Sequence, residues 1–203
     1  RALSTQAKAS AVLAQGDLGQ WLFLQNKALA IRHPHVEHIR AEMGSDLLVI
    51  TIAPEVRTVD VDGVFAETIE QLEENVRVHP RDVRRHLELG EVLMKRFEYF
   101  PDLNPDIPAA VDRIYERASD LSPQRQQVLF LHARALTLLN QFQKAQDILY
   151  QTRALTPSLN FVHRFVAPFL EEAGLYDEAI TTHETSIRIS VRRAGDKQGL
   201  ETE

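Results

Sequence analysis

Apolar residues recur every three to four positions along most of the chain, a spacing that places them on one face of an α-helix. Clusters of Pro, Gly, Asp and Asn interrupt this period and are typical of the turns between helices. The pattern therefore predicts an all-α protein. We expect helices at residues 3–15, 17–32, 35–53, 64–79, 81–99, 107–121, 124–139, 141–155, 158–173 and 175–192.

These helices form a repeat of paired helices. The best-formed pair occupies residues 124–157, which is 34 residues, and its Ala133 is the small residue at which the two helices come close. Each equivalent small residue is followed three positions later by leucine, and the intervals between the small residues are 34, 46, 43 and 34. The small residues are Ser10, Gly44, Gly90, Ala133 and Ala167, and the leucines are Leu13, Leu47, Leu93, Leu136 and Leu170.

Prolines and two insertions support this register. Proline lacks an N–H and has a fixed φ, so it ends helices, and Pro34, Pro80, Pro123 and Pro157 follow the second helix of four successive pairs. The two long intervals contain the loops that we expect at residues 54–63 and 101–108. The sequence thus predicts five helix pairs and a flexible tail, at 3–34, 35–80, 81–123, 124–157, 158–191 and 193–203.

The pattern resembles the tetratricopeptide repeat (TPR) over nearly all of the chain. Ala133, Ala145 and Pro157 match the family's small residue, its later alanine and its terminal proline. The resemblance implies a right-handed α-α superhelix whose concave groove binds a protein or peptide. The last pair continues the match with Ala167, Gly174, Tyr176 and Ala179, and the chain departs from it at Leu22, Thr68 and Val191.

In TPR arrays the first helix of each pair lines the groove, so the resemblance also implies a set of contact residues. Arg84, Arg134 and Arg164 could bind carboxylates of an extended peptide, with Phe130 and Phe161 as apolar anchors. The full set is His38, Arg84, Leu87, Glu91, Lys95, Gln127, Phe130, Arg134, Phe161, Arg164 and Glu171.

A simpler interpretation of the same arginines stays open. They would pair with Glu88, Glu91 and Glu171 on an ordinary solvated face, where exposed ion pairs contribute little. The family's two-asparagine clamp for a terminal carboxylate is not matched here, so the resemblance does not identify a partner.

A narrower resemblance is carried by residues 28–40 and 121–127 and by the long first loop. Together they resemble the TPR region that follows the membrane domain in some bacterial O-antigen ligase or polymerase-like proteins. Because the chain begins with Arg1 rather than Met, we expect a longer polypeptide. The resemblance implies that this chain is an extramembrane domain of a bacterial inner-membrane protein. It does not tell on which side of the membrane the domain lies. Any catalytic residues of such a protein would lie outside the 203 residues of this chain.

Two functions follow from these resemblances. The first is a non-catalytic scaffold that binds a peptide or partner protein, in bacterial surface-polysaccharide assembly. The alternative is an accessory domain that positions a saccharide for an O-antigen ligase or polymerase-like enzyme, or regulates that enzyme. Trp21 is expected in the core, with a stacking platform for sugar as the alternative. Homo-oligomerisation also stays open.

Composition narrows the classes of partner. The formal net charge is −6 and the pI about 5.8, which disfavours a nucleic-acid binder because such proteins concentrate Lys and Arg on one face. The chain has no cysteine, which rules out disulfides and thiolate metal sites. Its longest apolar stretch, residues 47–53, is far shorter than the roughly 20 residues that cross a bilayer.

No residue pattern in the sequence argues for catalysis. It contains no Gly-rich phosphate loop, no Gly-x-Ser-x-Gly elbow and no His-Glu-x-x-His helix, so we expect neither an enzyme nor a cofactor. His33, His35 and His38 form the one metal-like cluster, but no fourth ligand follows at a suitable spacing, and we expect no metal.

Two acidic segments have a simpler explanation than calcium binding. Asp60 and Asp62 lack the regularly spaced oxygen ligands of a calcium loop and are expected in a turn. Asp102, Asn104 and Asp106 are expected in a loop that caps the following helix. Pro168 should bend the helix that contains it.

Overall fold

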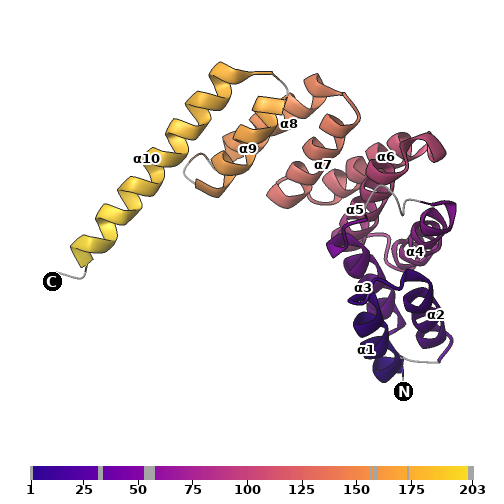
Figure 1. The fold of residues 1–203 in the computed structure, drawn as a ribbon. Helices are drawn as coiled ribbons and strands as arrows, with labels where there is room; N and C mark the ends of the chain where they lie inside the picture. The colour runs from indigo at the N-terminus through magenta and orange to yellow at the C-terminus, as the bar shows by residue number, and fades with distance from the viewer. Residues whose placement is uncertain are drawn as a thin grey trace. The chain divides into compact units, whose positions relative to one another are not determined.

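The computed structural model describes residues 2–31, 34–52, 58–155, 157, 160–172 and 174–200, with the side chains of 2, 3, 59, 161, 165 and 193–200 left out. This part of the chain is helical and contains no strand, which confirms the all-α prediction (Figure 1). The chain divides into two compact units, residues 1–121 and 122–203, here called the N-terminal and the C-terminal unit. The boundary coincides with the turn predicted after the third helix pair.

The N-terminal unit contains α1 (Ala2–Leu13), α2 (Leu18–Leu29), α3 (Val36–Val49), α4 (Val59–Val78), α5 (Val83–Tyr99), the short 3₁₀ helix η2 (Pro101–Leu103) and α6 (Ile107–Leu121). The C-terminal unit contains α7 (Gln126–Leu138), α8 (Phe142–Leu155), α9 (Asn160–Glu172) and α10 (Tyr176–Leu200). Every predicted helix is present. Pro34, Pro80, Pro123 and Pro157 lie in turns between a second helix and the next first helix, as predicted.

Two predicted helix boundaries are wrong by more than four residues. The loop at 54–63 was expected to end at Gly63, but α4 already begins at Val59, because the Thr58 hydroxyl accepts a hydrogen bond from the Val61 N–H at 3.4 Å. Asp60 and Asp62 therefore lie in the first turn of a helix, where negative charge complements the helix dipole, and not in a turn between helices. Residues 53–57 lie outside the described residues.

The second wrong boundary is the end of the last helix. α10 was expected to stop near residue 192 and continues to Leu200. The flexibility of residues 193–203 stays a prediction. The preceding turn follows the TPR pattern, since Gly174 adopts φ of 75° and the Leu175 N–H bonds to the Leu170 carbonyl at 2.8 Å, as in a helix terminus that needs glycine. α9 continues through Pro168.

Small residues mark close helix contacts in four of the five pairs. A Cβ added at Gly90 would lie 2.7 Å from Cζ of Tyr115 on α6, and one at Gly44 would lie 3.1 Å from Cδ1 of Leu72. Ala133 and Ala167 are fully buried. Ser10, by contrast, is exposed and its neighbour Ala9 is buried, so the small residue of the first pair was predicted one position too late.

The N-terminal unit holds its helices together with buried polar contacts. Trp21 on α2 is fully buried, and its Nε1–H donates to Asp46 on α3 at 3.0 Å. Gln25 donates to the same carboxylate at 3.3 Å. Burial raises the pKa of Asp46, and these two hydrogen bonds oppose that shift. The core position predicted for Trp21 is confirmed, and full burial excludes its indole as a stacking platform for sugar.

The C-terminal unit is built around one apolar cluster. Its buried members come from all four helices, and Ile148, Phe169 and Leu175 pack against them from the edge. The buried members are Phe130, Ala133, Leu149, Val162, Val166, Leu170 and Ala179.

Candidate functional site

Several groove residues predicted in the N-terminal unit have intramolecular partners. The Arg84 guanidinium donates to Glu88 at 2.9 Å, so for this arginine the solvated ion pair is confirmed. Leu87 is buried, and Glu91 is half-buried. His38 is exposed on α3, 4.0 Å from Glu42.

Lys95 was predicted as a partner contact, but its ammonium is engaged within the unit. Its Nζ donates to the carbonyl oxygens of Leu48, at 2.6 Å, and of Ile50. These carbonyls lie at the C-terminal end of α3, where a positive charge is stabilising. Lys95 therefore caps a neighbouring helix, a contact that joins residues 47 positions apart and that helical spacing does not reveal.

Phe130 is the clearest correction in the C-terminal unit. It was predicted as an exposed apolar anchor, but only 5% of the residue is exposed, because it packs against Val162 and Val166 of α9 in the apolar cluster. The side chain of Phe161, the second predicted anchor, lies outside the described residues. Glu171 pairs with His183 at 2.8 Å and not with an arginine.

Besides Glu171, three polar residues of the predicted groove are exposed in this unit. Gln127 and Arg134 lie on α7, and Arg164 lies on α9, which packs against α7. Relative to the small residues Ala133 and Ala167, the two arginines stand at positions that share one helix face. In this unit they form, together with Glu171, the exposed part of the predicted groove.

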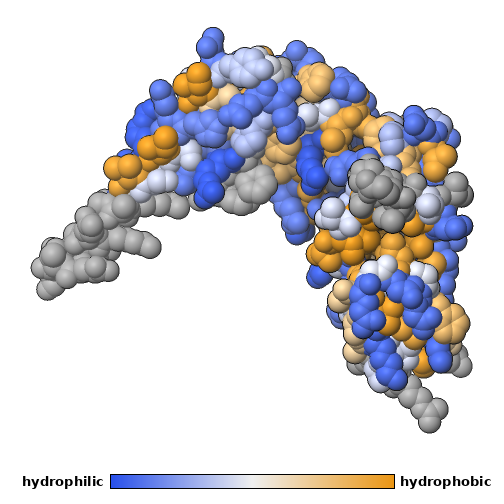
Figure 2. Space-filling model, viewed as in Figure 1, coloured by the Kyte–Doolittle hydropathy of each residue, from blue (hydrophilic) through white to orange (hydrophobic). Residues whose placement is uncertain are grey.

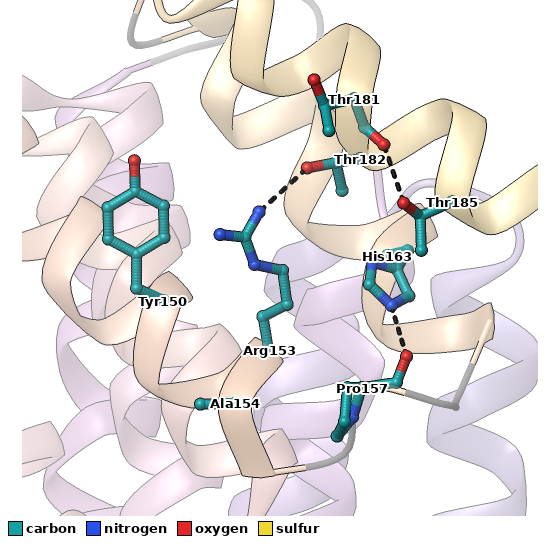
Figure 3. A pocket seen from close by; sticks show the side chains of 8 residues that line it. All are labelled: Tyr150, Arg153, Ala154, Pro157, His163, Thr181, Thr182 and Thr185. Carbon is teal, nitrogen blue, oxygen red and sulfur yellow. Dashed lines mark hydrogen bonds between the residues drawn. The ribbon is translucent and has the colours of Figure 1, made fainter.

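A pocket that was not predicted lies in this unit between α8, α9 and α10. It has a volume of about 460 Å³ and combines a cationic side chain with threonine hydroxyls (Figure 3). It is lined by Tyr150, Arg153, Ala154, Pro157, His163, Thr181, Thr182 and Thr185.

Arg153 supplies the positive charge of this pocket. Its guanidinium carbon lies 5.1 Å from the centre of the Tyr150 ring, and Nη1 donates to the Thr182 hydroxyl at 3.4 Å (Figure 3). Within the described part of the chain the guanidinium has no carboxylate partner. Since a guanidinium carries five N–H donors, most of them are available to a ligand.

The other polar groups of the pocket also have hydrogen-bond partners within the unit. Thr181 and Thr185 donate to the carbonyl oxygens of Asp177 and Thr181, each at 2.9 Å, which leaves their oxygen lone pairs as acceptors. His163 is buried, and its Nε2–H donates to the Pro157 carbonyl at 2.8 Å. At the rim, the Tyr150 hydroxyl donates to the Glu178 carboxylate.

Sequence reasoning missed this pocket because it considered only the first helices of the pairs. Tyr150 and Arg153 stand three residues apart on the second helix α8, next to the buried Leu149, so a polar face directed at the following pair was visible in the sequence. What helical spacing does not show is that α10 leaves room between itself and α8.

Among the described residues, no group of three or more His, Asp or Glu side chains is placed to hold a metal ion, and His33 lies outside them. In the described part of the chain, no helix combines the length and the apolar character needed to cross a bilayer.

Comparison with known proteins identifies the fold and no family. No protein-family model and no curated protein matches the sequence. Solved structures of MamA, a TPR-containing protein, are similar in fold. One MamA crystal structure has a TM-score of 0.58 at 15% identity and covers 96% of this chain and 94% of its own.

Two further structures agree with this result. A MamA RS-1 ArsTM double mutant has a TM-score of 0.57 at 12% identity, covering 95% of this chain and 96% of its own. A second MamA crystal structure has a TM-score of 0.56 at 16% identity, covering 90% and 94%. At these identities the likeness concerns the fold, and it shows that this chain is a TPR-like solenoid of helix pairs.

Proposed function

We propose that this chain is a non-catalytic protein-interaction scaffold whose C-terminal unit binds a carboxylate of a partner peptide in the pocket around Arg153. The observation that carries this proposal is the half-buried guanidinium in a preformed concavity. Preformed pockets with a few convergent polar groups are the commonest ligand sites in proteins.

The chemistry of the pocket favours a planar anion. A guanidinium binds a carboxylate through two parallel N–H···O bonds, which are stronger than hydrogen bonds between neutral groups. Stacking on Tyr150 holds the Arg153 head in place before a ligand arrives, so little side-chain freedom is lost on binding. An Asp or Glu side chain, or the carboxylate at the end of a peptide, has the matching shape and charge.

Fluorescence polarisation with short labelled peptides tests this proposal. We expect a Glu-rich peptide to bind and a Gln-rich peptide of equal length to bind at least tenfold more weakly, an order of magnitude typical of a charge-assisted bidentate contact. Arg153→Gln should remove the difference between the two peptides. Arg188→Gln, which changes an exposed arginine of α10 outside the pocket, should preserve it. Equal affinity of the wild-type chain for both peptides would contradict the proposal.

The exposed arginines of α7 and α9 provide a second candidate contact. Arg134 and Arg164 are accessible on neighbouring first helices, which is where the TPR resemblance places the peptide groove. The double variant Arg134→Gln/Arg164→Gln in the same assay separates the two sites. Loss of binding in this variant, with binding intact in Arg153→Gln, would assign the peptide to the predicted groove.

The role in bacterial surface-polysaccharide assembly, as a scaffold or as an accessory domain of an O-antigen ligase or polymerase-like enzyme, rests on the sequence resemblance alone. Two observations would test it. The reading frame upstream of Arg1 should encode several apolar segments of about 20 residues. The accessory-domain alternative further requires that a surface oligosaccharide shifts amide resonances of the labelled chain; without such shifts that alternative falls.

A further inference from the structure

A buried polar atom at the pocket around Arg153 has no hydrogen-bond partner among the described residues. This atom is Nδ1 of His163, a residue that is only 3% exposed. Most buried polar atoms in proteins are paired, so an exception beside a pocket requires an explanation. Figure 3 shows the imidazole between Thr185 and Pro157, facing Arg153 across the pocket that both residues line. Figure 2 shows the surface of the molecule around these helices.

The Pro157 carbonyl determines what this atom can do. A carbonyl oxygen only accepts hydrogen bonds, so Nε2 of His163, 2.8 Å from it, carries the proton. In a neutral imidazole the other ring nitrogen then presents a lone pair. Nδ1 is therefore an acceptor that lacks a donor, and a buried acceptor left unpaired is unfavourable.

The hydroxyl groups that line the pocket do not supply this donor. Thr181 and Thr185 donate to backbone carbonyls of α10, and Tyr150 donates to a carboxylate at the rim. The pocket thus offers the N–H groups of Arg153 for an anion and the lone pair of His163 for a donor. A ligand that satisfies both carries an anion and a donor close together.

We propose that one acidic residue of the partner peptide supplies both groups, with its carboxylate on Arg153 and its backbone N–H on Nδ1 of His163. An Asp or Glu residue carries these two groups a few bonds apart. The volume of about 460 Å³ lies within the range of roughly 300–1,000 Å³ that is usual for ligand pockets. This inference rests on the carboxylate pocket proposed above and adds a second point of recognition to it.

Backbone methylation of the peptide tests the second contact in the unaltered protein. The probe is a Gln-rich peptide with one central Glu and both ends blocked, titrated into the isotope-labelled complete chain while amide resonances are followed. Methylation of the Glu nitrogen removes the donor, so we expect the dissociation constant to rise at least about fivefold. Methylation of a Gln nitrogen three residues away is the control for the peptide backbone and should have no such effect.

His163→Gln tests the acceptor. The glutamine amide can still donate to the Pro157 carbonyl, but it has no acceptor at the position of Nδ1. We expect this variant to bind the Glu peptide and its N-methylated form equally and still to prefer Glu over Gln. His86→Gln is the matched control, because His86 is buried and precedes Gly90 by four residues, as His163 precedes Ala167. The control should keep the effect of methylation.

The outcomes separate this inference from the proposal on which it rests. If the wild-type chain prefers Glu over Gln but binds the N-methylated Glu peptide equally well, the inference fails and the carboxylate pocket stands. If it does not distinguish Glu from Gln, the pocket proposal fails as well. A further arm uses the all-Gln peptide with a free terminal carboxylate. A preference for this peptide over the blocked Glu peptide would overturn the assignment to an acidic side chain.

Discussion

The two units of this chain stabilise the same helix-pair architecture by different means. In the N-terminal unit, polar bridges join consecutive helices, such as those to Asp46 and Asp62. In the C-terminal unit, one apolar cluster includes residues of all four helices. The difference follows the spacing of the repeat, since both insertions fall in the N-terminal unit and the C-terminal pairs keep the 34-residue interval.

The Asp62 site shows how an insertion is accommodated. Nε and Nη2 of Arg96 on α5 donate to the two carboxylate oxygens of Asp62 on α4, each at 2.8 Å, and Asn104 of the second insertion donates at 2.9 Å. Nearby, the rings of Phe65, Tyr99 and Phe100 meet edge to face at 6.1–6.3 Å. Where the repeat is regular, one apolar cluster joins all four helices, and polar pairs such as Glu171 and His183 add to it.

The largest effect should come from the apolar cluster. Phe130→Ala removes a buried ring and leaves a cavity, so we expect it to lower the free energy of unfolding by about 3–5 kcal/mol. Urea denaturation followed by circular dichroism measures this. Phe23→Ala, at an exposed position, should change stability by no more than about 0.5 kcal/mol. If Phe130→Ala changed the free energy of unfolding as little as Phe23→Ala, Phe130 would not be a core residue, and the predicted role as an exposed anchor would stand.

A smaller effect should distinguish two helical glycines of the N-terminal unit. Gly90→Ala places a methyl group 2.7 Å from the Tyr115 ring, and such overpacking costs about 1–3 kcal/mol. In Gly63→Ala, on α4, the new Cβ meets nothing within 4 Å, and the better helix propensity of alanine should stabilise by about 0.5–1 kcal/mol. The melting temperature should therefore fall in Gly90→Ala and rise in Gly63→Ala. A shift in the same direction in both variants would show that the close contact between Gly90 and Tyr115 does not control stability.

Sequence reasoning succeeded where the structure depends on local periodicity. The helix order and the proline turns were predicted because helical spacing and proline chemistry act within a few residues. The leucines three residues after the small positions are all buried, because they lie on the same inner face of the first helices. The start of α4 was misplaced because Asp and Gly are typical of loops, and the Thr58 cap was overlooked.

The candidate site was harder to predict because it depends on contacts between distant residues. Helical position alone gives Phe130 and Arg164 the same place, three residues before the small residue, yet the first is buried by α9 and the second is exposed. Lys95 and Arg153 likewise derive their surroundings from helices that lie far from them in the sequence. A repeat pattern specifies which face a residue occupies, and the neighbouring pair decides whether that face is accessible.

A pH-dependent effect is expected at the bridge between α4 and α5. The hydrogen bonds from Arg96 hold the pKa of Asp62 below its ordinary value of 3.8. For a carboxyl group whose pKa is lowered by folding, the stabilisation is complete above the ordinary pKa and is lost as the pH falls through the lowered pKa of the folded state. Asp62→Asn should therefore lower the free energy of unfolding by about 1–2 kcal/mol at pH 7, and the difference from wild type should shrink below pH 4.

Asp60→Asn is the matched control for this variant. Asp60 lies in the same first turn of α4 but is exposed, so the variant removes a similar interaction with the helix dipole without touching Arg96. We expect it to cost no more than about 0.5 kcal/mol. Urea denaturation at pH 7 and pH 3 measures both variants. If Asp62→Asn and Asp60→Asn lower the free energy of unfolding by the same amount at pH 7, the Asp62 carboxylate acts only through the helix dipole. The contact between Asp62 and Arg96 would then add no stability that sets the N-terminal unit apart from the C-terminal unit.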